Sequence, residues 1–399
     1  MPQRKLDNWL NAYLEYTDNS ESPLAFHLWT AMGCIGAALQ RKVYMRWGHT
    51  DIYPNQYVVL VGPSGRARKG EAITIGRSMV KTLNIPMLGE DNSPEAIIKQ
   101  MDDSAGAFKD ETTGNMREMS SMAGFLEELS VFTGEQNKRF LAMLTNWYDS
   151  RDDWQRRTKN KGINELAGMC FNLVAATAPD WLPLILPHEA IGGGFTSRCI
   201  FIVETQKRKI ISNPNLKPPD KALRDRLIHD LEIIHTLTGE YKFTPETLEQ
   251  YENWYVQEEK KIEKGEGPVN DPAFAGYISR RATHVKKLGM IIAASQHDRR
   301  ELDLDSFEVA LNLMEKAEVG MQKVFAGIGK ARYAEESEAL IEFLSERKKV
   351  TKAAILRRFN RTVDSYVLDA VTETLVAMKR VRVKIDREEG ETYYVYMED

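Results

Sequence analysis

One stretch, residues 57–76, constrains the fold of this 399-residue chain more than any other. It reads YVVLVGPSGRARKGEAITIG, which is an apolar run, a glycine-containing turn, basic residues and then apolar residues at helical spacing. The short apolar run predicts a buried strand, and the spacing that follows predicts a helix. A glycine loop between a strand and a helix is the context in which backbone amides at a helix N-terminus can bind phosphate.

The glycine loop does not match the usual phosphate-loop pattern, G-x-x-x-x-G-K-[S/T]. Counted from Gly62, the lysine position holds Arg68, and the lysine follows as Lys69. We interpret Lys69 as the residue that reaches the phosphates, from a loop that is one residue longer. The residues of this candidate site are Gly62, Pro63, Ser64, Gly65, Arg66, Ala67, Arg68, Lys69, Gly70 and Glu71. The alternative is a plain turn between a strand and a helix, although such a turn does not favour so basic a patch.

A second departure concerns the metal that accompanies a nucleotide. The residue after the lysine is usually a serine or threonine whose hydroxyl binds Mg²⁺, whereas here it is Gly70. Either Glu71, Ser64 or a water molecule then completes the metal shell, or the use of metal is weak.

Composition limits the class of protein. Hydrophobic residues at 42% and charged residues at 28% are ordinary for a soluble globular protein, and the length predicts two or three domains. The net charge of −4 excludes a globally basic nucleic-acid coat, so any nucleic-acid site must be a local patch. Cys34, Cys170 and Cys199 lack metal-ligand spacing and are interpreted as buried reduced thiols. Without a signal peptide or a membrane-length apolar run, we expect a cytoplasmic protein with no membrane partner.

Polar side chains follow two further expected strands. GFLEELS places Glu127 and Glu128 at the end of one strand, where one acid can hold Mg²⁺ and the other can polarise an attacking water. Alone, such a pair is commonly a solvated edge. NLVAATAPD ends in Thr177, which could orient the water or a γ-phosphate, as could Asn172 if the strand ends earlier. An ordinary strand-end residue remains the alternative.

Several short strands alternating with helices predict an α/β fold with a mostly parallel sheet covered on both faces. Before the last strand, GGGFTSRCIFI carries Arg198 just after a glycine run. A lone arginine there is commonly a surface residue. In a ring of identical subunits it would reach the γ-phosphate of a neighbour.

The pattern divides the chain into four parts: an N-terminal helical segment (1–45), a core (46–205), a helical lid (206–330) and a C-terminal domain (331–399). The lid begins with a basic, proline-containing linker at 206–221. Three helical segments followed by two strands in the C-terminal part are typical of a winged helix. Its expected third helix is acidic and a poor face for phosphates, so protein docking and weak DNA-backbone binding both remain open.

Together these segments resemble an AAA+ ATPase. The chain is most similar to the phage- and plasmid-associated helicase-like P-loop ATPases, on the motifs DIYPNQYVVLVGPSG (51–65) and GFTSR (194–198). The resemblance covers about residues 10–205. It implies a P-loop NTPase core with a helical lid, and an ATP-driven motor on nucleic acid, related to the superfamily-three and minichromosome-maintenance ring helicases.

The resemblance also implies roles for particular residues. Lys69 would bind the phosphates, Glu127 and Glu128 would serve the metal and catalysis, Asn172 or Thr177 would be the sensor, and Arg198 would act in trans. In the lid, Arg280 or Arg281 would be a second sensor that touches the nucleotide, the alternative being a solvated basic helix face. The chain departs from the family at Glu127, where aspartate is usual, and at Gly70.

A β-hairpin is expected at about 151–168, where such motors place a DNA-contacting hairpin. Its candidate DNA-binding residues are Trp154, which could stack on a base, and the cations Arg156, Arg157, Lys159 and Lys161. The alternative is a hairpin whose charges face water.

The expectation from sequence is therefore a ring-forming, hexameric ATP hydrolase that uses ATP and Mg²⁺ and acts as a DNA helicase in phage-type replication, in the cytosol of a bacterial host. Single-stranded DNA is the expected substrate, and other replication proteins are possible partners. The alternatives are an ATP-binding helicase loader and a DNA-binding scaffold with a degenerate nucleotide site.

Overall fold

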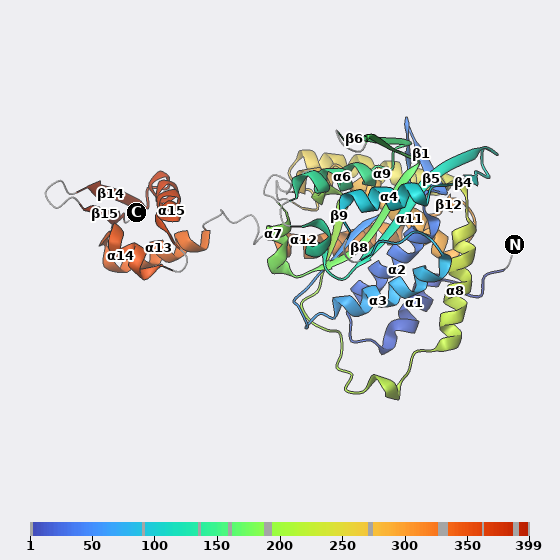
Figure 1. Cartoon of the computed structure of the whole chain (residues 1–399), viewed down its shortest axis with the longest axis horizontal. Coiled ribbons are helices and arrows are strands. Elements are labelled where there is room, and N and C mark those ends of the chain that lie inside the picture. The colour runs from blue at the N-terminus through green and yellow to red at the C-terminus, as the bar shows by residue number, and fades with distance from the viewer. Residues whose placement is uncertain are drawn as a thin grey trace. The chain divides into compact units, whose positions relative to one another are not determined.

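The computed structural model of the chain (Figure 1) describes residues 3–89, 92–134, 137–158, 162–186, 194–269, 274–325, 334–360, 363–385 and 391–397. The chain forms two compact units, residues 1–325 and 326–399. The N-terminal segment, the core and most of the expected lid therefore belong to one unit, because contacts among them are continuous.

A five-stranded sheet lies at the centre of the first unit. Its strand order is β4-β5-β8-β3-β9, with β4 antiparallel to β5 and the other neighbours parallel. This confirms an α/β fold with a largely parallel sheet. The strands are β3 (Tyr57–Val61), β4 (Gly106–Lys109), β5 (Met116–Leu126), β8 (Met169–Thr177) and β9 (Cys199–Val203). All of β3 is buried, which explains why its sequence is an unbroken apolar run.

Helices cover both faces of this sheet, as the sequence predicts. On one face, α2 (Leu24–Leu39) approaches β8 so closely that a Cβ on Gly33 would lie 2.2 Å from Val174 Cγ2. On the other face, Trp147 of α6 (Lys138–Tyr148) packs edge-on against Phe171 of the same strand, with ring centroids 5.6 Å apart. Positions 171 and 174 point to opposite faces because side chains alternate along a strand.

Helix α3 (Lys69–Val80) lies beside α2 (Figure 1), where Gly76 lets the two helices meet at Thr30. The expected lid also joins this layer, since α11 (Arg281–Gln296) packs against α2 and is buried almost all round. Next to it, α12 (Leu304–Phe325) covers β9. The three cysteines are buried and free, as expected.

Further elements complete the first unit. The helices are α1 (Trp9–Tyr16), α4 (Pro94–Asp103), α5 (Leu129–Thr133), α7 (Leu182–Ile185), α8 (Lys221–Thr236), α9 (Pro245–Glu263) and α10 (Ala275–Ile278). The strands are β1 (Val43–Trp47), β2 (Thr50–Ile52), β6 (Asp153–Thr158), β7 (Gly162–Ala167), β10 (Gly239–Glu240), β11 (Lys242–Phe243) and β12 (Glu301–Leu302). Short 3-10 turns lie at Thr17–Asn19, Lys81–Leu83, Pro179–Trp181, Thr196–Arg198 and Pro214–Leu216.

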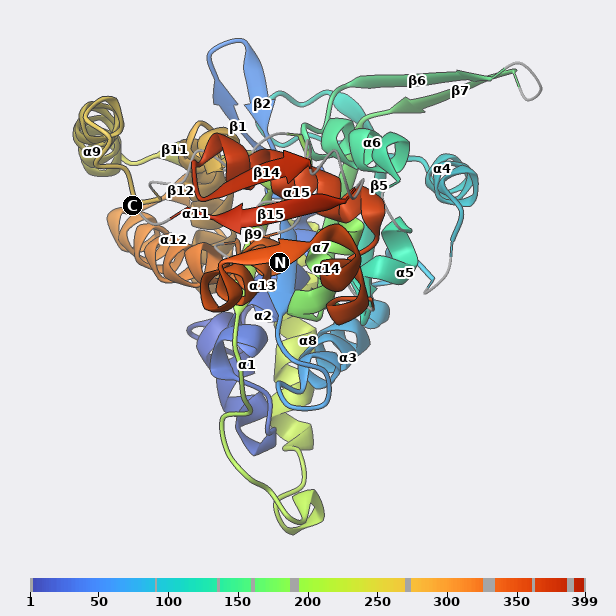
Figure 2. The same cartoon turned by 90° about the vertical axis from the view of Figure 1, so that its left-hand side faces the viewer.

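The second unit has its own core, which includes Leu344, Ile355, Leu368 and Tyr394. Its elements are α13 (Ala334–Arg347), β13 (Lys349–Thr351), α14 (Lys352–Arg358), α15 (Ser365–Ala377), β14 (Val381–Ile385) and β15 (Thr392–Tyr396). The two C-terminal strands pair in antiparallel fashion, as expected (Figure 2), and a short third strand, β13, joins β15 on its other side.

Candidate functional site

A cavity of about 710 Å³ opens at the carboxyl ends of the parallel strands. Three parts of the chain line it: the loop and helix start from Ser64 to Thr74, the acids Glu127 and Glu128, and a wall made by residues near 19–21 and 211–214. Val61 of β3 lies between the ends of β8 and β9. In open α/β sheets, ligands bind at the carboxyl ends of the strands, at the point where the strand order reverses.

The loop after β3 has a backbone path that requires glycine. Gly62 donates its N–H to the Thr177 carbonyl at 3.2 Å. A Cβ on Gly62 would lie 2.5 Å from the Glu204 carbonyl oxygen and 2.6 Å from the Ala67 Cβ, so a side chain does not fit. Gly65 has a φ of +71°, a left-handed conformation that glycine adopts without strain. The loop is therefore a turn whose conformation depends on its glycines, and its tip, from Ser64 to Arg66, faces solvent.

Lys69 begins α3 and is the best-buried cation of the cavity, with 8% of its surface exposed. Among the described residues, its hydrogen-bond acceptor is the carbonyl of Gly62. Burial lowers the pKa of Lys69, and the negative charge of Glu128 opposes that change. A lysine beside the free amides of a helix N-terminus forms a site for an anion such as phosphate.

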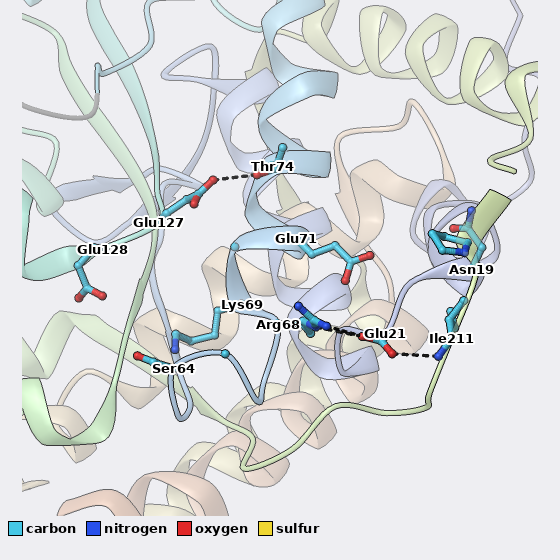
Figure 3. A pocket seen from close by; sticks show the side chains of 13 residues that line it. Asn19, Glu21, Ser64, Arg68, Lys69, Glu71, Thr74, Glu127, Glu128 and Ile211 are labelled. Carbon is cyan, nitrogen blue, oxygen red and sulfur yellow. Dashed lines mark hydrogen bonds and ion pairs between the residues drawn. The ribbon is translucent and has the colours of Figure 1, made fainter.

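Two acids at the end of β5 line the same cavity as this lysine, and the Glu127 carboxylate is turned toward Thr74 (Figure 3). Glu127 accepts a hydrogen bond from the Thr74 hydroxyl, with 2.9 Å between Oγ1 and Oε1. Glu128 accepts one from Ser130 at 3.2 Å. The strand ends at Leu126, so both acids lie at the sheet edge that the sequence predicts. Thr74 was not predicted, because no motif assigns a role to a hydroxyl at that place in the helix.

Gly70 lies next to the Glu127 carboxylate. A Cβ at Gly70 would lie 3.2 Å from Glu127 Oε2, so this carboxylate lies against the helix where a side chain at 70 would begin. Of the expected metal-shell substitutes, Glu71 and Ser64 both line the cavity.

The wall of the cavity is held by Glu21. Its carboxylate accepts hydrogen bonds from Arg68 Nε at 3.0 Å, Lys207 Nζ at 2.7 Å and the Ile211 N–H at 2.9 Å (Figure 3). The bond from Lys207, followed by that from Ile211, lowers the pKa of Glu21 to about 2. Glu21 thereby ties the glycine loop after β3 to the segment after β9.

That segment, residues 206–217, is the basic linker of the sequence, and we call it the strap. Asp18 pairs with three of its cations, Arg208, Lys209 and Lys217. The strap is thus docked on the N-terminal turn by charge. Beside it, a second cavity of about 490 Å³ is lined by the loop tip, including Arg66, and by strap residues 206–210.

The two sensor candidates of β8 differ in position. Thr177 ends the strand, buried, and holds the loop through its carbonyl. Asn172 lies at the other end of the sheet: its Oδ1 accepts from the Gln56 N–H and its Nδ2 donates to the Gly33 carbonyl, both at 3.0 Å. The condition for Asn172, an earlier strand end, is not met, because β8 continues to Thr177. Neither residue is among the described residues that line the cavity.

The candidate arginines form ion pairs away from the described lining of the cavity. Arg198 is buried and pairs with Asp149 at 2.8 Å, and Asp149 also lies 3.5 Å from Arg280. Arg281 is buried between two glutamates.

For Arg281, the ion pairs join it to Glu318 at 2.6 Å and to Glu258 at 2.7 Å. Its guanidinium is engaged in the helical layer, so contact with a nucleotide stays a prediction and would require these ion pairs to open. The alternative, a solvated helix face, is wrong because Arg281 is buried.

The hairpin expected at 151–168 is present as β6 and β7, which extend away from the sheet (Figure 2). Trp154 is half-buried, with its ring edge-on to Trp147 at 5.8 Å, so part of its surface serves packing. The backbone of Arg156 and Arg157 lies in β6. Lys159 and Lys161 lie outside the described residues.

Comparison with protein-family models finds no match, and no curated protein is significantly similar to the chain. Among the described helices, none combines the length and apolar character needed to cross a membrane. The described part of the chain also holds no group of three or more His, Cys, Asp or Glu side chains placed to bind a metal. Mg²⁺ that arrives with a nucleotide needs only one or two carboxylates besides the phosphates.

Proposed function

We propose that the first unit binds and hydrolyses a nucleoside triphosphate, ATP, with Mg²⁺. The observation that carries this proposal is the placement of Lys69 at the N-terminus of α3, in the same cavity as Glu127 and Glu128. A buried lysine and two acids at the edge of a parallel sheet are the groups that bind and hydrolyse a magnesium-bound triphosphate.

The residues present fit the phosphates. Lys69 donates to the neutral carbonyl of Gly62, and a phosphate oxygen is a better acceptor for its charge. The first amides of α3 point the positive end of the helix dipole toward the same place. Lys69 would therefore hold the β- and γ-phosphates.

The residues also fit the metal. Glu127 presents a carboxylate oxygen over Gly70, and Thr74 holds the other oxygen. Bound there, Mg²⁺ would neutralise charge on the phosphates. Glu128 would accept the proton of the attacking water, which is the role of a general base placed beside the γ-phosphate.

We further propose that this activity drives a DNA motor assembled as a ring. The order of helices and strands in the second unit is the one expected of a winged helix, and the projecting hairpin suits a contact with DNA. Arg198 would contact the phosphate of a neighbouring subunit only after its pair with Asp149 opens. The ring-shaped motor remains distinct from a loader, which binds ATP without separating strands, and from a scaffold whose DNA binding ignores nucleotide.

The experiment measures ATP turnover and ATP binding with and without single-stranded DNA. Glu128→Gln should retain ATP binding and lose about 10²-fold or more in turnover, as expected for a general base. Glu249→Gln, at an exposed carboxylate of α9 that is not among the described residues lining the cavity, is the control and should turn over within about threefold of wild type. Equal turnover in wild type and Glu128→Gln would contradict the proposed hydrolysis.

DNA distinguishes the wider roles. A motor predicts stimulation of turnover by single-stranded DNA and separation of a forked duplex. ATP binding without strand separation would favour the loader, and DNA binding unaffected by ATP would favour the scaffold.

A further inference from the structure

Two departures from the usual phosphate site meet at one point of this structure. Gly70 stands where a metal-binding hydroxyl is usual, and Glu127 is one methylene longer than aspartate. The Glu127 side chain lies directly against Gly70: a Cβ there would lie 3.2 Å from Oε2, 3.4 Å from Cδ and 3.9 Å from Cγ. The longer acid therefore lies in contact with the place where a side chain at position 70 would begin.

The missing hydroxyl is supplied one turn later. Thr74 follows Gly70 by four residues in α3, so the two positions share one face of the helix. The Thr74 hydroxyl donates to Glu127 Oε1 at 2.9 Å, which leaves Oε2 over Gly70. All three residues line the same cavity (Figure 3).

We propose that Gly70, Thr74 and Glu127 are a compensated set, in which Thr74 positions the Glu127 carboxylate for the hydrated divalent cation of a bound nucleotide. The inference rests on the proposed ATP site and deepens it. Thr74 is a positioning residue, because it acts through Glu127 and not on the phosphates. Without Thr74, the longer and more flexible glutamate would sample several rotamers, and its oxygen would be less well placed for the metal.

The first test compares Thr74→Val with Thr74→Ser. Binding of Mn²⁺ is titrated by electron paramagnetic resonance in the presence of a non-hydrolysable ATP analogue, and melting temperature is recorded alongside. Thr74→Val should weaken Mn²⁺ binding about five- to tenfold, because it removes a hydrogen bond to a charged group. Thr74→Ser should restore it. Ser78→Ala is the matched control: its hydroxyl, one turn further on, donates to the Ile75 carbonyl, and its loss should leave Mn²⁺ binding unchanged.

The second test rebuilds the usual pair. Glu127→Asp draws the carboxylate away from Thr74, and Gly70→Ser places a side chain against Glu127, so each single change should weaken Mn²⁺ binding. Combined, the shorter acid and the new hydroxyl fit each other, and the double variant should bind Mn²⁺ more tightly than either single variant.

Two results would overturn the inference alone: normal Mn²⁺ binding in Thr74→Val, or a double variant no better than the worse single variant, in both cases with the ATP analogue still bound. A lower melting temperature in Thr74→Val with unchanged Mn²⁺ binding would assign the hydroxyl a merely structural role. Failure of wild type to bind the analogue would instead overturn the proposed ATP site, and this inference with it.

Discussion

The cavity at Lys69, which we propose binds a nucleotide, and the ion-pair cluster around α11 are both rich in charge, yet the charged groups have different partners. In the cavity, Lys69 is buried against a neutral carbonyl while acids line the same space. In the cluster, Arg198 and Arg281 are equally buried but each is paired to a carboxylate of the same chain. A buried cation that has no ion-pair partner among the described residues is suited to an incoming anion. A paired one contributes to the fold.

The largest effect is expected on the free energy of unfolding, when Arg281 is replaced. Arg281→Met leaves Glu318, which is 2% exposed, without its cation and with the Tyr277 hydroxyl as a neutral partner, and it removes one of the two cations that pair with Glu258 in the described part of the chain. Breaking a buried ion pair from one side costs about 3–5 kcal/mol, which urea unfolding would measure. ATP affinity of the folded fraction should not change.

The matched control is Arg280→Met, since the Arg280 side chain is 34% exposed and its pair with Asp149 is long, at 3.5 Å. We expect a cost of about 1 kcal/mol or less there. Loss of ATP binding in Arg281→Met without loss of stability would instead make Arg281 part of the nucleotide site.

The second effect concerns pH and His284, which lies in the same cluster. Burial lowers its pKa to about 3, whereas an unfolded histidine titrates near 6.5. Below pH 6.5 the unfolded chain therefore binds a proton that the folded chain does not, so stability falls as pH drops from about 6.5 toward 3. The slope contributed by this one group approaches about 1.4 kcal/mol per pH unit.

His284→Gln removes that contribution. Urea unfolding of both proteins between about pH 4 and 6 should give a shallower fall in unfolding free energy for the variant. Parallel curves would show that His284 titrates normally in the folded chain, and that the cluster is more open to water than its packing indicates.

The smallest effect is expected at the cavity wall. Glu21→Gln removes the charge that holds Lys207 and Arg68, so trypsin should cut the strap faster after Lys207 and its neighbours. Exposed ion pairs are weak and screened by salt, so the difference from wild type should shrink in about 0.5 M NaCl.

Asp18→Asn separates the two roles of this wall, which are to hold the strap and to hold Arg68. It should loosen the strap through Arg208 and Lys217, but it does not free Arg68. In Glu21→Gln, Arg68 is released at the cavity and can attract phosphate, so ATP affinity should rise about twofold. In Asp18→Asn, Arg68 stays paired with Glu21, so ATP affinity should stay constant. Identical trypsin cleavage in wild type and Glu21→Gln would show that Glu21 does not hold the strap.

The parts of the fold that the sequence predicts are those with local signals. The apolar run of β3, the glycine turn and the helix beginning at Lys69 follow one another in the chain, and the structure has them in that order. Glu127 and Glu128 were predicted at a strand end because an apolar run stops just before them. Burial on both faces also hides strand ends, since β8 is buried throughout and its sequence does not show that Asn172 lies far from the carboxyl end of the strand.

The parts that sequence could not predict depend on partners distant in the chain. Glu258 and Glu318 neutralise Arg281 from two other helices, so its basic helix looked solvated. Asp18 and Glu21 neutralise the strap from the N-terminus, so the strap looked like a free basic linker. Thr74 gains a meaning only once Glu127 is placed beside α3.

The central claim is that Lys69 marks a nucleotide site, and equilibrium binding of ATP by calorimetry tests it most directly. Lys69→Ala removes the buried cation and should weaken ATP binding by about 100-fold or more, as expected for a charge-assisted bond to phosphate. Lys81→Ala is the matched control, since this exposed lysine lies at the other end of α3 and is not among the described residues that line the cavity, and it should bind ATP within about threefold of wild type. ATP binding by Lys69→Ala equal to that of wild type would contradict the account and leave residues 57–76 as a turn between a strand and a helix.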